Sequence, residues 1–288
     1  MAERRQSDIL YFVYLMLQLY QQYQQLPYKP PMTIALALLL VLIYVLEGQF
    51  PLMITKWCMC PFYIFSSHHW TELYRIFTSA VIHIDDYHLY YNISSLLWKG
   101  SFLEVVTGSK SFIVMTLFLT IVSGIYFLLI TSFFNWIGFF TSSYYNRTVG
   151  FSGVLFGYKL ISHFYNAGPS SLAGIRMPPS YITWVELLYC SLFPNVSFFG
   201  HLSGILAGYT YVALPKVFPK LQEVRRQWRR AAEERREREE QRRDGDNPYH
   251  YSQEDYSHLN DELRRRRYWD CLFSMQYPFL GSTESATI

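Results

Sequence analysis

The sequence is poor in charge over most of its length. Only 16% of the 288 residues are charged, and residues 111–146 contain no charged side chain at all. Because roughly 20 apolar residues are enough to span a bilayer, a run of that length excludes a wholly soluble protein. Hydrophobic residues make up 51% of the chain and aromatic residues 19%, which also excludes a disordered chain.

The sequence also has few cysteines and a small net charge. Four cysteines, Cys58, Cys60, Cys190 and Cys271, fit neither a disulfide framework nor a Cys-x-x-Cys zinc pattern. The net charge of +3 is too small to indicate nucleic acid as a partner. The chain has no His-Glu-x-x-His pattern, so the sequence predicts neither a metal site nor a cofactor.

The charges that are present divide the chain into three parts. Residues 32–214 hold 13 charged side chains, whereas the much shorter stretch 220–267 holds 26. We therefore predict a membrane domain over 32–215 and a cytosolic tail over 216–288. Residues 1–31 form the remaining part, in which an apolar patch at 9–20 predicts a helix lying in the membrane interface.

Six apolar stretches are candidate membrane spans, some of them short enough to require packing inside a bundle. They cover residues 33–53, 87–103, 111–134, 149–166, 180–193 and 196–214. An even number of spans places both termini on one side. The excess of flanking cations selects the cytosol for that side, with Arg4, Arg5, Lys29, Lys99, Lys110, Lys159, Arg176, Lys216 and Lys220 set against Lys56, Arg75 and Arg147.

Four polar residues lie within these spans at one depth. His88 and Asn92 come one turn apart in the second span, Ser152 opens the fourth and His201 opens the sixth. All four fall within roughly 10 Å of the same lumenal surface, at 1.5 Å per helical residue. Polar groups inside a membrane are costly and usually mark a functional site.

Glycines accompany these polar residues. Gly150 and Gly153 lie on either side of Ser152, where they allow the backbone to bend and another chain to approach. On the sixth span Gly204 and Gly208 share one face, and small residues at this spacing let membrane helices touch. We expect this contact to bring the histidine of the sixth span within hydrogen-bond reach of the serine.

The four polar side chains suit acyl-transfer chemistry. A serine hydroxyl becomes nucleophilic when an adjacent histidine accepts its proton, and the pair Ser152 and His201 can act in this way. His88 and Asn92 can donate hydrogen bonds to a developing oxyanion, together with the backbone N–H of the serine.

Three motifs together resemble those of the rhomboid intramembrane serine proteases. In chain order they are His88-x-x-x-Asn92, Gly150-x-Ser152-Gly153 and Gly200-His201-x-x-Gly204-x-x-x-Gly208. Phe156 is similar to the aromatic residue that stacks on the base in that family, and Tyr74-Arg75 to its Trp-Arg pair. The resemblance implies an all-α bundle of six transmembrane helices. It also implies a Ser–His dyad that cuts membrane-spanning substrates near the lumenal face.

The tail carries a second resemblance. Arg225, Ala231, Ala232 and Arg235 form an Arg-x5-Ala-Ala-x2-Arg pattern within a charged helical stretch. It is similar to the helical motif that binds the N-terminal domain of valosin-containing protein, the AAA ATPase that extracts proteins from the endoplasmic reticulum. The segment 262–267 is a second, looser candidate. These motifs imply an endoplasmic reticulum membrane protein that acts in quality control and associated degradation.

Two further interpretations remain at this point. A non-catalytic receptor or dislocation factor of the derlin kind shares the same fold and would recruit the same ATPase. The membrane carboxylates Glu104 and Glu186 are expected to be structural, either paired or snorkelling toward the membrane surface.

Overall fold

The computed structural model is mainly helical. It describes residues 6–26, 28–48, 53–66, 70–165, 170–172, 175–177, 179–193 and 196–217, together with residues 230 and 234. The longer helices are α1 (Gln6–Gln25), α2 (Pro31–Glu47), α6 (Asp86–Thr107), α7 (Ser109–Trp136), α9 (Ser152–Phe164), α10 (Pro179–Cys190) and α11 (Phe198–Val217). The short ones are α3 (Met53–Trp57), α4 (Pro61–Ser66), the 3-10 helix η1 (Trp70–Tyr74), α5 (Arg75–Val81) and α8 (Ser142–Tyr145).

A helix lies at each of the six predicted spans, and α1 covers the predicted interfacial segment. The largest difference is in α2, which ends at Glu47 where the prediction continued to residue 53. The N–H of Gly48 still donates to the Tyr44 carbonyl at 3.3 Å, as in the preceding turn of the helix. By length and composition, α7 alone among the described helices is long and apolar enough to cross a membrane; Pro31–Glu47 and Phe198–Leu214 are apolar but shorter.

One element departs from the all-α prediction. Strands β1 (Ser170–Leu172) and β2 (Ile175–Met177) pair antiparallel between α9 and α10. Three-residue strands are too short to show a clear alternation of polar and apolar residues, so the sequence pattern did not predict them.

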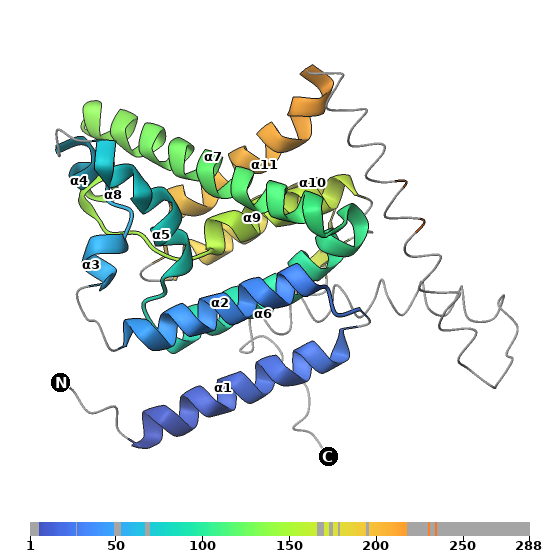
Figure 1. The fold of residues 1–288 in the computed structure, drawn as a ribbon. Helices are drawn as coiled ribbons and strands as arrows, with labels where there is room; N and C mark the ends of the chain where they lie inside the picture. The colour runs from blue at the N-terminus through green and yellow to red at the C-terminus, as the bar shows by residue number, and fades with distance from the viewer. Residues whose placement is uncertain are drawn as a thin grey trace, which may run out of the picture.

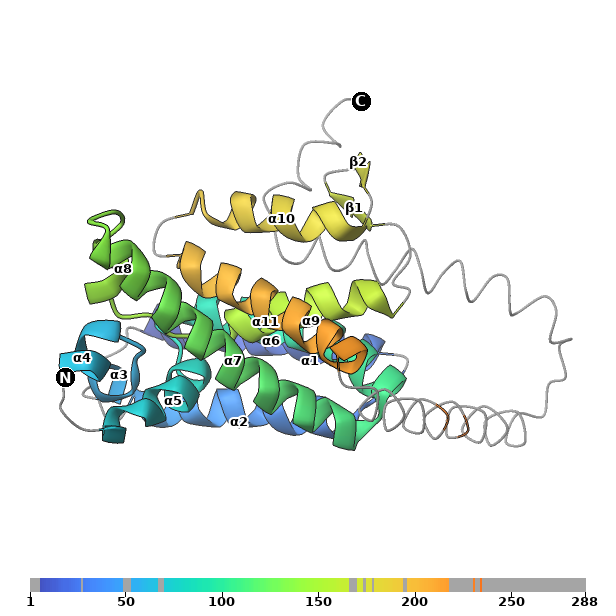
Figure 2. The ribbon, with the colours of Figure 1, turned by 90° about the horizontal axis from the view of Figure 1, so that it is seen from above.

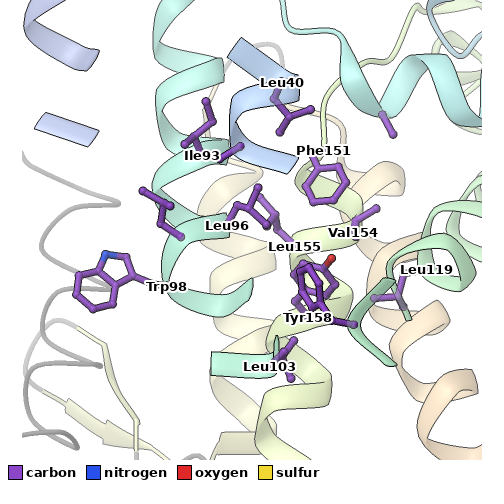
Figure 3. Packing of buried hydrophobic residues seen from close by; sticks show 14 of the residues in the cluster. Leu40, Ile93, Leu96, Trp98, Leu103, Leu119, Phe151, Val154, Leu155 and Tyr158 are labelled. Carbon is purple, nitrogen blue, oxygen red and sulfur yellow. The ribbon is translucent and has the colours of Figure 1, made fainter. Parts of the chain in front are cut away.

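The helices form a bundle in which α9 and α11 lie beside each other at the centre (Figures 1 and 2). The main core lies where α2, α6, α7 and α9 meet, and Figure 3 shows Leu40, Leu96, Leu119 and Tyr158 pointing into it. Lipid is as apolar as such a core, so close packing and internal hydrogen bonds must hold the helices together. The buried Tyr158 hydroxyl accordingly lies 2.5 Å from Thr116 Oγ1 on α7.

Glu104 has the structural role expected for it. Its carboxylate accepts hydrogen bonds from the N–H groups of Met32 and Thr33, at 3.0 and 2.7 Å, and from the hydroxyls of Thr33 and Ser109. The negative charge therefore lies at the N-terminal ends of both α2 and α7, where the helix dipole favours it. One side chain of α6 thus fixes where two neighbouring helices begin.

Three of the predicted flanking cations are buried instead. Lys99 and Lys159 are 4% and 3% exposed, and both pair with Glu186. Arg75 is also buried and pairs with Glu72. The count of flanking cations becomes seven against two, in place of nine against three, so its direction is unchanged.

Candidate active site

Ser152 is the first residue of α9. Backbone hydrogen bonds hold the preceding segment in place. Met59 and Thr148 exchange two of them, and the N–H of Gly150 donates to the Ser79 carbonyl at 2.8 Å. Gly150 has a φ of +110°, a backbone conformation that residues with a side chain rarely adopt. The sharp turn sets the serine at the mouth of the helix.

His201 reaches Ser152 from α11. Its Nε2 lies 2.9 Å from Ser152 Oγ, which is hydrogen-bond distance. Ser197 fixes the start of α11, since its hydroxyl accepts a hydrogen bond from the Gly200 N–H at 3.1 Å. Phe156, one turn after the serine, stacks on the imidazole with ring centroids 4.4 Å apart and an angle of 25° between the planes. The imidazole is thus held between a hydroxyl at its edge and an aromatic ring on its face.

A close contact between glycines sets the distance between α9 and α11. A Cβ added at Gly204 would overlap the backbone carbonyl of Gly153. One turn further on, Gly208 lies against the Gly157 carbonyl, 3.1 Å from where its own Cβ would be. The backbones of the two helices therefore touch directly below the serine and the histidine.

Among the described residues, the other nitrogen of the imidazole has no carboxylate partner. Within the described part of the chain, His201 Nδ1 is buried and makes no hydrogen bond. In this part of the chain, the serine and the histidine are therefore paired with each other and with no acidic side chain.

His88 and Asn92 lie on α6 beside this pair. A Cβ at Gly150 would be 2.5 Å from His88 Nε2, so the imidazole fills the space next to the turn that carries Ser152. Asn92 donates from Nδ2 to the His88 carbonyl at 2.6 Å. The side-chain amide keeps a second N–H that this bond does not use.

His83 was not among the predicted site residues. It is 1% exposed, and its ring meets that of His88 edge to face with centroids 5.0 Å apart. Burial lowers the pKa of His83 to about 3, with the nearby His88 as a second cause, so the side chain is neutral at physiological pH. The five-residue spacing of His83 and His88 is the sequence signal that could have indicated this contact.

Arg75 organises the loop between α2 and α6. Its guanidinium donates to the Glu72 carboxylate and to the carbonyls of Thr55 and Cys58, at 3.1 and 3.0 Å. Tyr74 donates to the Lys56 carbonyl at 2.8 Å. Burial raises the pKa of the Cys58 thiol, which keeps it protonated and unreactive. The loop that supplies Met59 to the turn before Ser152 is therefore held by the Tyr74-Arg75 pair.

The remaining predicted residues concern metals and the tail. In the regions that the structure covers, no group of three or more His, Cys, Asp or Glu side chains is arranged to hold a metal ion. Arg225, Ala231, Ala232, Arg235 and the segment 262–267 lie outside the described residues.

Comparison with known proteins places this chain in a family. The family model described as the rhomboid domain matches residues 70–216, which is more than half of the chain. The chain is 39% identical over 199 residues to "Rhomboid-like protein 14, mitochondrial" of Arabidopsis thaliana, covering 67% of this chain and 58% of that protein. It is 36% identical over 190 residues to "Rhomboid-related protein 4" of Homo sapiens, covering 65% and 58%.

A third relative carries an activity in its name. "Rhomboid-type serine protease 2" of Eremothecium gossypii is 28% identical over 184 residues, covering 63% of this chain and 67% of that protein. For the first two relatives, the match spans less than two thirds of their own length, 58% in each case. The match of residues 70–216 includes His88, Ser152 and His201, and the chain belongs to the rhomboid family of membrane proteins.

Proposed function

We propose that this chain is an intramembrane serine endopeptidase that cleaves transmembrane proteins near the lumenal face of the bilayer. The observation that carries the proposal is the 2.9 Å contact between His201 Nε2 and Ser152 Oγ, with Phe156 stacked on the imidazole. A hydroxyl bonded to an imidazole in a fixed orientation is the arrangement that activates a serine nucleophile.

The reaction follows from the roles of the two side chains. Ser152 Oγ attacks the scissile carbonyl while His201 accepts its proton at Nε2. The histidine then donates that proton to the leaving amine, and a water molecule hydrolyses the acyl-enzyme by the reverse sequence of proton transfers. The stacked Phe156 keeps the imidazole aligned through both steps.

Oxyanion stabilisation falls to the groups on the other side of the serine. The backbone N–H of Ser152 lies at the start of α9, where N–H groups have no partner within the helix. His88, beside Gly150, and the second N–H of Asn92 are the side-chain donors. Donors fixed in this way are most valuable when negative charge develops on the carbonyl oxygen.

The membrane arrangement is part of the proposal. Helices α2, α6, α7, α9, α10 and α11 form six spans, with residues 32–215 as the protease domain and both termini in the cytosol. The flanking cations support this orientation. Short helices such as α9 cross as part of a bundle and not alone.

The compartment and the partner are proposed from the tail. The pattern of Arg225, Ala231, Ala232 and Arg235 supports binding to valosin-containing protein. Two consecutive small residues in a helix allow close approach to a groove, and the arginines supply charge beside it. The protein would then act in the endoplasmic reticulum membrane and hand cleaved fragments to the ATPase for degradation.

The proposal is tested with the purified full chain in liposomes and a labelled single-span substrate. We expect cleavage near the lumenal end of the substrate helix, abolished by Ser152→Ala and unaffected by Ser142→Ala, an exposed serine ten residues earlier. Equal cleavage by the Ser152→Ala variant would exclude the assigned nucleophile.

The Ser152→Ala variant, together with Arg225→Ala, distinguishes the protease from the derlin-like receptor. A non-catalytic receptor would deliver substrates for degradation as well with Ser152→Ala as with the native chain, but not with Arg225→Ala. Delivery that is lost with Ser152→Ala, from a chain that still binds the ATPase, favours the protease.

A further inference from the structure

The segment that runs from α5 into α6 contacts the active site at two points. The Ser79 carbonyl on α5 accepts a hydrogen bond from the Gly150 N–H at 2.8 Å, which holds the turn before Ser152. Four residues later, His83 packs its ring edge to face against that of His88, with centroids 5.0 Å apart. The proposed reaction uses Ser152 and His88 but gives His83 no role.

The backbone of His88 is fixed independently of its side chain. Its N–H donates to the Asp85 carboxylate at 2.7 Å, and its carbonyl accepts a hydrogen bond from Asn92 Nδ2 at 2.6 Å. Neither bond restrains the two torsions that orient the imidazole. The side chain is also partly exposed, so its orientation depends on the groups that pack beside it.

Two groups restrict the His88 imidazole. One is Gly150, where an added Cβ would come 2.5 Å from His88 Nε2. The other is the ring of His83, which lies at 66° to the plane of the imidazole. Edge-to-face packing favours particular orientations of two rings, because the positive edge of one faces the negative face of the other. A residue without a ring at position 83 would leave the imidazole free to turn away from the oxyanion.

His83 itself has a fixed position. Its side chain is 1% exposed, and the preceding Ile82 has no exposed surface. The backbone N–H of His83 lies near the carboxylate of Glu47, the buried last residue of α2. Figure 1 shows the connection from α5 to α6 reaching this end of α2. His83 is therefore anchored well enough to orient a neighbouring ring.

The effect of His83 on its neighbour is one of shape. Burial lowers the pKa of His83 to about 3, so the ring carries no charge at physiological pH. An aromatic ring without nitrogen atoms should consequently replace it, whereas an aliphatic side chain of similar size should not.

We propose that His83 is a positioning residue of the protease, whose ring holds the His88 imidazole in the orientation that donates a hydrogen bond to the oxyanion. This rests on the proposed function, because the oxyanion forms only when Ser152 attacks a carbonyl. His83 acts through His88 and not on the substrate. Since the oxyanion donor matters most in the transition state, the loss of His83 should affect kcat more than KM.

The test measures kcat and KM per folded molecule for the full chain in liposomes, with a labelled single-span substrate. His83→Leu should lower kcat about tenfold through misplacement of the donor, and KM should change less than about twofold. His83→Phe should retain most of the native kcat. Ile84→Ala, an exposed neighbour in the same segment, is the matched control and should cleave like the native chain.

A double-mutant cycle shows whether His83 acts through His88. His88→Ala alone should lower kcat about 100-fold, because one oxyanion donor is lost. Adding His83→Leu to His88→Ala should cause no further loss, whereas adding it to Asn92→Ala should still lower kcat about tenfold. A tenfold loss in both backgrounds would overturn the proposal.

Folding is measured separately, by thermal midpoint and by the yield of folded protein. If His83→Leu is less stable but has the native kcat per folded molecule, His83 has only a structural role and the proposal is overturned. Equal kcat values for His83→Leu and His83→Phe would overturn it as well, because the ring would then be dispensable.

The outcomes also separate this proposal from the proposed function. Native cleavage by His83→Leu, with Ser152→Ala inactive, overturns the positioning role and leaves the protease in place. If Ser152→Ala cleaves as fast as the native chain, the protease assignment fails instead. The ring-proton NMR signals of His88 in histidine-labelled protein then still measure the contact. They should shift in His83→Leu and not in Ile84→Ala, and unshifted signals in both would exclude the contact.

Discussion

The orientation of His201 depends on one aromatic contact. Phe156 stacks on the imidazole at 4.4 Å and is itself 4% exposed. We predict that Phe156→Ala lowers kcat by about 10- to 100-fold, because small misplacements of a catalytic base are costly. The cavity should also lower the free energy of unfolding by about 3 kcal/mol.

Controls separate alignment from folding. Phe156→Tyr keeps the stacked ring and should retain most activity, and Phe164→Ala, at the exposed end of the same helix, should retain all of it. Both are assayed by substrate cleavage and by thermal midpoint in detergent. If Phe156→Ala cleaves as fast as the native chain, the ring does not position the base.

His83 makes stability depend on pH. Burial lowers its pKa from 6.5 to about 3, so between these values the unfolded chain binds a proton that the folded chain does not. Stability from this residue is therefore complete above pH 6.5 and decreases as the pH falls toward 3. Between pH 7.5 and 5.5 the expected loss is about 1.4 kcal/mol.

The variant His83→Phe tests this, since a phenyl ring can keep the edge-to-face contact with His88 without titrating. Unfolding is followed at pH 7.5 and 5.5 for both proteins, and the difference between the two pH values should be smaller for the variant. The same pH difference in both would show that His83 is not the titrating group.

The serine, the histidine and their glycines could be predicted because their positions depend on order and depth alone. Ser152 and His201 both lie at the beginning of spans that start at the lumenal face. A rise of 1.5 Å per residue therefore places them at the same depth in the membrane. The contacts that refine the site are different in kind. Ser79 and Met59 act through their backbone atoms, so the identity of their side chains does not indicate these contacts.

The contact between α9 and α11 depends on Gly204. A methyl group there would overlap the Gly153 carbonyl, so the helices would have to separate and His201 would move away from Ser152. We predict that Gly204→Ala costs about 3 kcal/mol or more of stability and removes measurable cleavage. Thermal unfolding and the cleavage assay measure the two effects.

Gly48→Ala is the matched control. Gly48 has a helical φ of −57°, and the nearest atom to an added Cβ is 3.4 Å away, so this variant should fold and cleave normally. A fully active Gly204→Ala variant would contradict the close backbone contact.

The burial of Lys99 could not be predicted because helix ends are the least certain feature of a sequence pattern. The second span was predicted to end at residue 103, which placed Lys99 near the membrane surface. Helix α6 continues to Thr107, and this extra turn puts Lys99 inside the bundle. Its partner Glu186 comes from a helix 87 residues later, and no local pattern indicates such a pair.

The full chain combines two proposed activities that variants can separate. Ala231→Glu should abolish binding of the purified protein to the N-terminal domain of valosin-containing protein, because a charged side chain blocks close approach of the helix. Cleavage by the membrane domain should be unchanged. Binding is measured by co-purification, with Arg242→Ala as a control outside the motif; binding that survives Ala231→Glu would exclude this motif as the contact.

Activation of Ser152 by His201 is the central claim, and covalent labelling measures it most directly. The purified chain in detergent is treated with a fluorophosphonate that reacts only with activated serines, and the modified peptide is identified by mass spectrometry. We predict an adduct on Ser152, formed at least about 100-fold more slowly in a folded His201→Ala variant. An adduct on another serine, or an unchanged rate without the histidine, would contradict the account.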